Sequence, residues 1–274
     1  MSNTHPNPPM QKLKRVGLGI GSLFIIISLM LYFLQEKLIF LPTTLPQDYE
    51  YSFSEPFEEL FLETDDGARL NALHFKRDEP KGLILYFHGN AGDLSRWGAI
   101  ATFFVQKEYD VLVMDYRTYG KSTGNLNEAS LYADAALFYQ YAKQRYNEDD
   151  IIIYGRSLGA AIATQLASVT QPAKLLLETP FYNLYDVAKD RFGMLPIRQL
   201  LKYEFKSNKY ITKVTCPIRI FHGTEDRVVP YASGQELFKT IAQSDKRFYT
   251  IDNGGHNDLV EFEGYLKAIE LELP

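Results

Sequence analysis

Short apolar runs recur along most of this chain and alternate with stretches that have helical periodicity. The strand-like runs lie at 58–63, 69–75, 82–88, 110–115, 150–155, 173–178, 216–222 and 246–251. The helical stretches lie near 94–107, 127–146, 157–169, 231–243 and 257–271. Because alternation of this kind requires crossover helices, the pattern predicts an α/β fold with a mostly parallel eight-stranded sheet and flanking helices. The first two runs are close enough to form a hairpin.

One segment interrupts this alternation. Residues 181–210 follow the sixth strand-like run and are rich in aromatic and apolar residues, with a break at Pro196. We interpret the segment as a short helical cap over the active site, since lids are usually built from inserted segments. The alternative is a helix pair that packs on the edge of the sheet.

The N-terminal part of the chain has the composition of a membrane anchor. Val16 to Leu34 is an uncharged stretch of nineteen residues, and as a helix it would extend about 28 Å, close to the thickness of the hydrocarbon core. Lys12, Lys14 and Arg15 precede it. The positive-inside rule then places residues 1–15 in the cytoplasm and the catalytic domain on the outer, periplasmic or extracytoplasmic, side.

A cleaved signal peptide is the competing interpretation of the same segment. Its apolar core would normally be shorter and would end near small residues, whereas Tyr32 to Lys37 offers no such site, so an uncleaved anchor at 16–34 is favoured. Residues 35–51 are expected to form a juxtamembrane linker whose Leu38, Ile39, Phe40 and Leu41 suit the bilayer interface. The globular domain is then 52–274.

A serine between two glycines is the strongest chemical signal. Gly155-Arg156-Ser157-Leu158-Gly159 follows an apolar run and precedes a stretch of small helix-forming residues. The bland interpretation is a turn that happens to contain serine. The flanking strand and helix instead indicate a nucleophile elbow that holds the Ser157 hydroxyl above the edge of the sheet.

A serine nucleophile needs a histidine base and a carboxylate to orient it. Of the five histidines, His256 lies in a glycine-rich loop after the last strand-like run, where a base can reach over the sheet. Asp226 follows another apolar run in a turn of short polar residues, where it could also be a helix cap, and Glu225 is a weaker candidate. The order Ser157, Asp226, His256 is that of a nucleophile-elbow hydrolase.

An oxyanion hole is predicted from two backbone amides. The run at 82–88 ends in His88-Gly89-Asn90, a loop of small residues. The N–H of Asn90 would pair with that of Leu158, at the start of the helix after Ser157, on the developing negative charge.

These motifs together resemble the α/β-hydrolase family, most closely its membrane-anchored serine-hydrolase branch of depalmitoylase-like and serine-aminopeptidase-like proteins. The resemblance extends from about residue 37 to the C-terminus, and its motifs are His88 to Asp93, Asp115 to Arg117, Tyr119 to Gly124, Gly155 to Gly159, His222-Gly223 with Asp226, and Gly255-His256. Thr118 departs from the glycine that the family often has after the arginine. That departure affects the expected loop shape rather than the catalytic residues.

Composition narrows the function further. The net charge is −5 and the globular part has no basic block, which argues against a nucleic-acid partner. The single cysteine, Cys216, excludes an intrachain disulfide and a lipidated cysteine beside the anchor. No metal-binding motif is present, and no cofactor is expected.

We therefore expect a membrane-anchored serine hydrolase that cleaves carboxylic esters or thioesters of a small, lipid-like or lipidated-protein substrate. Two alternatives stay open: a serine aminopeptidase-like enzyme, for which Glu178 could bind the substrate amine, and a non-catalytic binding or scaffold protein.

Overall fold

The computed structural model describes residues 8–274, and its centre is the predicted α/β sheet. The strands of this sheet are β2 (Phe57–Glu63), β3 (Arg69–Phe75), β4 (Leu83–Phe87), β6 (Asp110–Met114), β7 (Ile151–Arg156), β8 (Lys174–Glu178), β9 (Ile218–Gly223) and β10 (Lys246–Ile251). Their order is β10-β9-β8-β7-β4-β6-β3-β2, with eight strands. The β2–β3 hairpin is antiparallel and β3 joins β6 antiparallel, while all other pairs are parallel. The predicted fold class and hairpin are thus confirmed.

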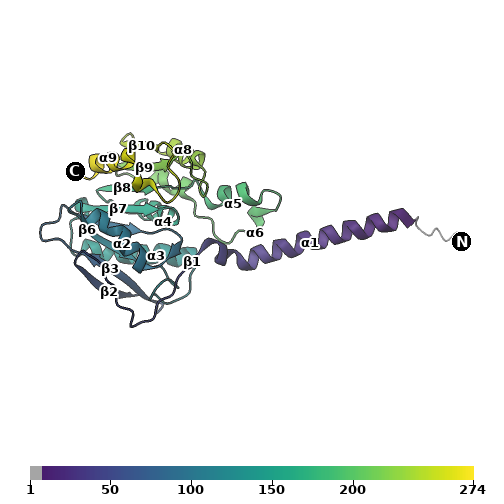
Figure 1. Cartoon of the computed structure of the whole chain (residues 1–274), viewed down its shortest axis with the longest axis horizontal. Helices are drawn as coiled ribbons and strands as arrows, with labels where there is room; N and C mark the ends of the chain where they lie inside the picture. The colour runs from purple at the N-terminus through teal and green to yellow at the C-terminus, as the bar shows by residue number, and fades with distance from the viewer. Residues whose placement is uncertain (1–7) are drawn as a thin grey trace.

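Helices cover both faces of the sheet (Figure 1). They are α2 (Leu94–Val105), α3 (Glu128–Lys143), α4 (Leu158–Ala167), α8 (Tyr231–Thr240) and α9 (Glu263–Glu272). Apolar side chains of α3, α4 and α8 belong to one buried core, and those of α2 and α9 belong to a second. Since parallel strands are enclosed on both faces, β4, β6 and β7 consist mainly of apolar residues, and every residue in them is buried.

The C-terminal helix begins later than the sequence pattern predicts. Helical structure was expected from 257, but α9 begins at Glu263 after a short 3-10 turn at Leu259–Glu261. The Asp258 carboxylate accepts a hydrogen bond from the Gly255 N–H at 2.7 Å, which stabilises a turn in place of a helix. The loop that contains His256 is therefore longer than expected.

The segment 181–210 contains three short helices, α5 (Leu184–Phe192), α6 (Ile197–Leu200) and α7 (Ser207–Tyr210). In Figure 1, α5 and α6 lie beside the part of α1 (Pro8–Ile39) that leaves the globular domain. Tyr203 and Phe205, by contrast, are buried in the core of the domain. The segment thus combines a peripheral helical pair with a well-packed return to the sheet.

Helix α1 is apolar and long enough to cross a bilayer. The most apolar 18 residues within Lys12–Ile39 have a mean hydropathy of 2.3, and none of these 18 residues is buried inside the protein. The helix continues to Ile39, so the first residues of the expected linker are helical. The remaining residues lead through β1 (Leu41–Pro42), which pairs in parallel with β5 (Ala91–Gly92) in a small second sheet.

Phe40 corrects one expectation about this junction. It was predicted to lie at the bilayer interface, but it is only 4% exposed. Its ring packs edge-on against Tyr203 at 5.0 Å and against Phe205 at 6.4 Å. Leu38 and Leu41 are exposed as expected. The end of α1 is therefore anchored in the domain by an aromatic side chain.

Candidate active site

Ser157 occupies a sharp turn between β7 and α4. Its φ of 54° and ψ of −115° lie outside the usual regions for a residue with a side chain, a strained geometry that clusters at functional sites. Both neighbouring glycines are required by close approach. A Cβ on Gly155 would lie 2.5 Å from the Gly159 carbonyl oxygen, and one on Gly159 would lie 2.0 Å from the Phe87 carbonyl oxygen. This is the geometry predicted from the sequence pattern.

The structure brings Ser157, His256 and Asp226 together from three separate loops. The Ser157 hydroxyl lies 3.0 Å from Nε2 of His256, and Nδ1 of His256 lies 2.7 Å from Oδ2 of Asp226. Ser157 and Asp226 are buried, while the His256 side chain is 9% exposed. A hydroxyl, an imidazole and a carboxylate in this order form a chain along which a proton can move to and from the serine.

Asp226 is held by more than the histidine that the sequence indicated. Its Oδ1 accepts hydrogen bonds from the N–H groups of Val228 and Val229, both at 2.8 Å, so it is also the turn residue that was considered as an alternative role. Glu225 is exposed. Burial opposes ionisation of the Asp226 carboxyl, but hydrogen bonds from His222 and His256 outweigh it and hold its pKa well below the usual range.

The contact with His222 was missed in the sequence analysis. His222 is fully buried, and its Nε2 lies 3.2 Å from Oδ2 of Asp226 and 3.1 Å from the Val229 carbonyl oxygen. Since both neighbours are acceptors, Nε2 carries the proton and donates. The position of His222 four residues before Asp226, at a strand end, is the only sequence signal for this contact, and it does not distinguish the pair from a packed core histidine.

Arg156 orients the loop of His256. Its guanidinium donates to the His256 carbonyl oxygen at 3.2 Å and to Oδ1 of Asn257 at 3.1 Å, and it pairs with Oε1 of Glu178 at 3.1 Å. Glu178 is 6% exposed and also accepts hydrogen bonds from Tyr154 and Tyr265. Its carboxylate is therefore fully engaged below the site.

The loop of Asn90 is tied to the end of α1. The Asn90 carbonyl oxygen accepts from the Leu41 N–H at 2.9 Å and from the Tyr119 hydroxyl at 2.7 Å, while its side-chain amide donates to the Ile39 carbonyl oxygen at 3.1 Å. These bonds hold the loop in place between the end of α1 and Tyr119. Asn90, Ser157 and Leu158 line one cavity of about 210 Å³.

Apolar side chains form most of the remaining wall of this cavity. They come from the cap, from the turn after Asp226 and from the end of α1: Leu38, Ile39, Phe181, Leu184, Val187, Ala188, Phe192, Val228 and Val229. Arg191 is the charged residue among them, and its guanidinium donates to the Val228 carbonyl oxygen at 3.0 Å. The site therefore offers an apolar chamber beside a hydroxyl nucleophile.

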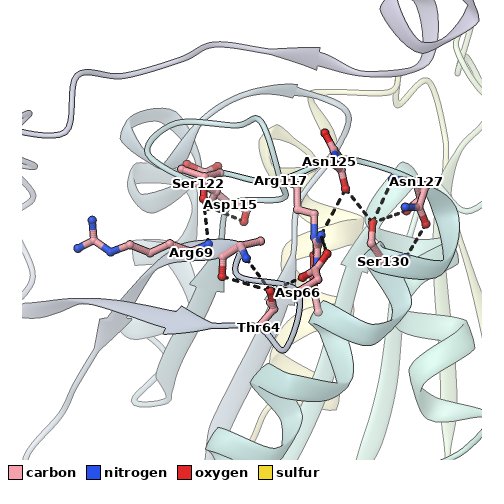
Figure 2. Close-up of polar contacts among 12 residues, drawn as sticks. Thr64, Asp66, Arg69, Asp115, Arg117, Ser122, Asn125, Asn127 and Ser130 are labelled. Atoms are coloured by element: carbon pink, nitrogen blue, oxygen red, sulfur yellow. Dashed lines mark hydrogen bonds and ion pairs between the residues drawn. The ribbon is translucent and has the colours of Figure 1, made fainter.

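The motif formed by Asp115 to Arg117 and Tyr119 to Gly124 has a structural role (Figure 2). Arg117 is buried and makes paired hydrogen bonds to Asp66 at 2.5 and 2.9 Å and to Asp134 at 2.8 and 2.9 Å. The Ser122 hydroxyl donates to the Asp115 carbonyl oxygen at 3.0 Å and accepts from the Asn71 N–H at 2.8 Å. Ser122 is thus occupied by backbone and is not placed as a nucleophile.

Thr118, which stands where the family often has glycine, has an unusual backbone conformation. Its φ is 72°, so it holds the left-handed conformation in which glycine is favoured. A β-branched residue in this conformation carries local backbone strain.

Comparison with known proteins places the chain in a family. The sequence profile of the serine aminopeptidase S33 hydrolases matches residues 78–202 and 187–263. The chain belongs to this α/β-hydrolase family. An uncharacterised protein of Mycobacterium tuberculosis is 32% identical over 82% of the chain and 81% of its own length.

Two vertebrate relatives carry functional or domain names. The lysophosphatidylserine lipase ABHD12 of Danio rerio is 27% identical over 86% of this chain and 74% of its own length. The human α/β-hydrolase domain-containing protein 17C is 30% identical over 81% and 68% of the two chains. An esterase of Pyrococcus furiosus superposes with a TM-score of 0.66 at 19% identity, covering 84% of this chain and 97% of the other. The family and these relatives support hydrolase activity in this chain.

Proposed function

We propose that this protein is a single-pass, membrane-anchored serine hydrolase that cleaves carboxylic ester or thioester bonds through an acyl-enzyme. The observation that carries the proposal is the hydrogen-bonded chain from the Ser157 hydroxyl through His256 to Asp226. The name of one relative, the lysophosphatidylserine lipase ABHD12 of Danio rerio, supports a small-molecule or lipid-like acyl substrate.

The proposed chemistry follows from the two nitrogens of His256. With Nδ1–H donating to Asp226, Nε2 has its lone pair directed at the Ser157 hydroxyl and takes its proton as the oxygen attacks the acyl carbonyl. The ionised Asp226 stabilises the imidazolium that results. The N–H groups of Asn90 and Leu158 would hold the oxyanion, His256 would protonate the leaving group, and water would release the acyl chain.

An ester or thioester is favoured over a peptide by two features. The wall beside Ser157 is mainly apolar and suits an acyl chain. Glu178, considered as a carboxylate for a substrate amine, is instead buried and paired with Arg156. A lipid or the acyl group of a lipidated protein fits this chamber better than the charged N-terminus of a peptide.

The substrate class is tested with the full chain in detergent micelles. Decanoyl oxyester, thioester and amide with a matched leaving group would be compared in the wild type and in Ser157→Ala. We expect ester and thioester turnover to exceed that of the amide by about a hundredfold or more, and Ser157→Ala to lose a factor on the order of 10⁴ to 10⁶. Preferential cleavage of the amide would favour a peptidase, and no turnover of any acyl compound would favour a scaffold protein.

The proposed topology places the N-terminus in the cytoplasm and the catalytic domain on the outer side of the membrane. Its support is the apolar span of α1 with Lys12, Lys14 and Arg15 before it. A reporter active only outside the cytoplasm, fused after Pro274, is expected to be active, and the mature protein is expected to retain Met1. A soluble form that begins after residue 34 would instead show a cleaved signal.

A further inference from the structure

A second cavity lies between α1 and the cap, directly next to the chamber of Ser157. It has a volume of about 70 Å³ and is formed by α1, α5, α6 and the residue after α6. Five residues line both cavities: Leu38, Ile39, Leu184, Ala188 and Phe192. The two spaces are therefore neighbours that share an apolar wall.

The outer cavity, which we call the α1–cap groove, is apolar throughout its described lining. Leu31, Ile197, Leu200 and Leu201 complete its wall with Gln35. The Gln35 amide donates to the carbonyl oxygens of Leu200 at 3.0 Å and Tyr32 at 2.9 Å, and its oxygen accepts from the Lys202 N–H at 2.8 Å. Because the polar atoms of the Gln35 side chain are hydrogen-bonded to backbone groups, only its methylene groups line the groove.

One wall of the groove belongs to the segment that is assigned to the bilayer. Leu31 belongs to the uncharged stretch 16–34, whose outward-facing residues are exposed, as Leu29 at 51% and Phe33 at 67% illustrate. In Figure 1 the α5–α6 pair projects along α1 away from the sheet. The turn between these two helices exposes Met194 at 95%, and an apolar residue so exposed next to a membrane helix is suited to the interface.

We propose that the α1–cap groove is the route by which the acyl chain of a membrane lipid reaches Ser157 directly from the bilayer. The inference rests on the proposed hydrolase function and specifies its substrate: a long acyl chain that stays in apolar surroundings while its carbonyl enters the chamber. The groove has no free polar groups among its described lining to pair with a peptide backbone, and its volume of about 70 Å³ is too small for a helix. A single hydrocarbon chain matches both its chemistry and its position.

A matched pair of substitutions on α1 tests this route in the full-length protein in lipid–detergent micelles. Leu31→Trp fills the groove, whereas Leu29→Trp adds the same bulk two residues away on the exposed surface of the same helix. The measured quantity is the ratio of palmitoyl ester to acetyl ester turnover. We expect Leu31→Trp to lower that ratio by about tenfold or more, since several methylene groups lose their apolar contacts, and Leu29→Trp to keep the wild-type ratio.

Failure of the route and failure of the proposed function give different results. If both esters are cleaved by the wild type and the two variants have equal ratios, the route is wrong and the hydrolase function stands. If neither ester is cleaved by the wild type, the proposed function fails and the route fails with it.

A chemical crosslink keeps the route testable if Leu31→Trp does not fold. The probe is a hexadecyl fluorophosphonate with a diazirine at the end of its chain, which first reacts at Ser157 of the wild type and is then photoactivated. We expect crosslinked peptides from 31–39 and from 184–201. Attachment at Ser157 with crosslinks only elsewhere in the domain would overturn the route, and no attachment at Ser157 would overturn the proposed function.

Discussion

The carboxyl edge of the sheet and the α1–cap region border the same cavity, but different forces hold their side chains. Around Ser157, positions are fixed by polar contacts and by backbone approach, as in the 2.7 Å bond between His256 and Asp226. Around α5 and α6, packing is apolar and open, with Phe192 39% exposed and Met194 almost wholly so. Reaction chemistry needs groups placed to within tenths of an ångström, whereas an acyl chain needs only apolar surface of suitable width.

Gln35 combines polar contacts with a position in the apolar α1–cap region. It is a buried amide on the long apolar helix α1, and its bonds to Leu200 and Lys202 connect α1 to the cap. On the other side of the helix end, the Leu41 N–H and the Ile39 carbonyl oxygen hold the loop of Asn90. The anchor is thus connected both to the apolar chamber and to the loop assigned to the oxyanion.

Substitutions in the polar region around Ser157 should have the largest effect on turnover. His256→Ala removes the proposed base and is expected to lower turnover by a factor on the order of 10⁴ to 10⁶. Asp226→Asn, which leaves an amide in contact with both His256 and His222, should lower it somewhat less. Turnover of short and long acyl esters would be measured, and both should fall equally because the cap is unchanged. A loss confined to long esters would contradict the assigned roles.

Loosening the contact between anchor and cap should give a smaller, local effect. Gln35→Leu leaves the Leu200 carbonyl and the Lys202 N–H without a buried partner, at a cost of about 1–3 kcal/mol. Hydrogen–deuterium exchange should become faster in 184–202 and stay unchanged in β7 and β8. Gln140→Leu, at an exposed position of α3, is the matched control. Equal exchange in both variants would show that Gln35 does not hold the cap.

The polar region around Ser157 could be predicted from the sequence more fully than the region around α1. Strands β7 and β9 were located within two residues because buried parallel strands are mainly apolar runs. Ser157, Asp226 and His256 could be selected as candidates because each lies at a strand-end loop with a recognisable pattern, and the structure brings their side chains within hydrogen-bonding distance. The β1–β5 pair has two residues in each strand and no periodicity. Phe40 was misplaced because an apolar residue after a long apolar helix suits an aromatic core as well as the lipid interface. Tertiary packing alone decides between them.

The smallest expected effect concerns His74, which lies on β3 and contacts Tyr146. Burial lowers the pKa of His74 to about 4. In the unfolded chain it takes up a proton below about pH 6.5, while the folded protein leaves it neutral, so stability falls as the pH is lowered from about 6.5 toward 4. Between pH 7.5 and 5.5 the loss from this group is about 1 kcal/mol.

Chemical denaturation of the full chain at these two pH values, with His74→Gln as the comparison, measures how much unfolding free energy is lost through His74. In the wild type, Nε2 of His74 lies 3.0 Å from the Tyr146 hydroxyl, and a glutamine side chain can form the same hydrogen bond. The variant should show the smaller loss of unfolding free energy on acidification. Identical losses would mean that His74 is protonated in the folded protein as readily as in the unfolded one.

Covalent labelling of the full-length protein by an alkyl fluorophosphonate tests the central claim most directly. We predict a single adduct, mapped by peptide mass spectrometry to Ser157, which is absent in Ser157→Ala and forms much more slowly in His256→Ala. The contradicting result is an adduct on Ser122, or labelling of Ser157→Ala at the wild-type rate. Either would show that the hydrogen-bonded chain of Ser157, His256 and Asp226 does not produce the nucleophile.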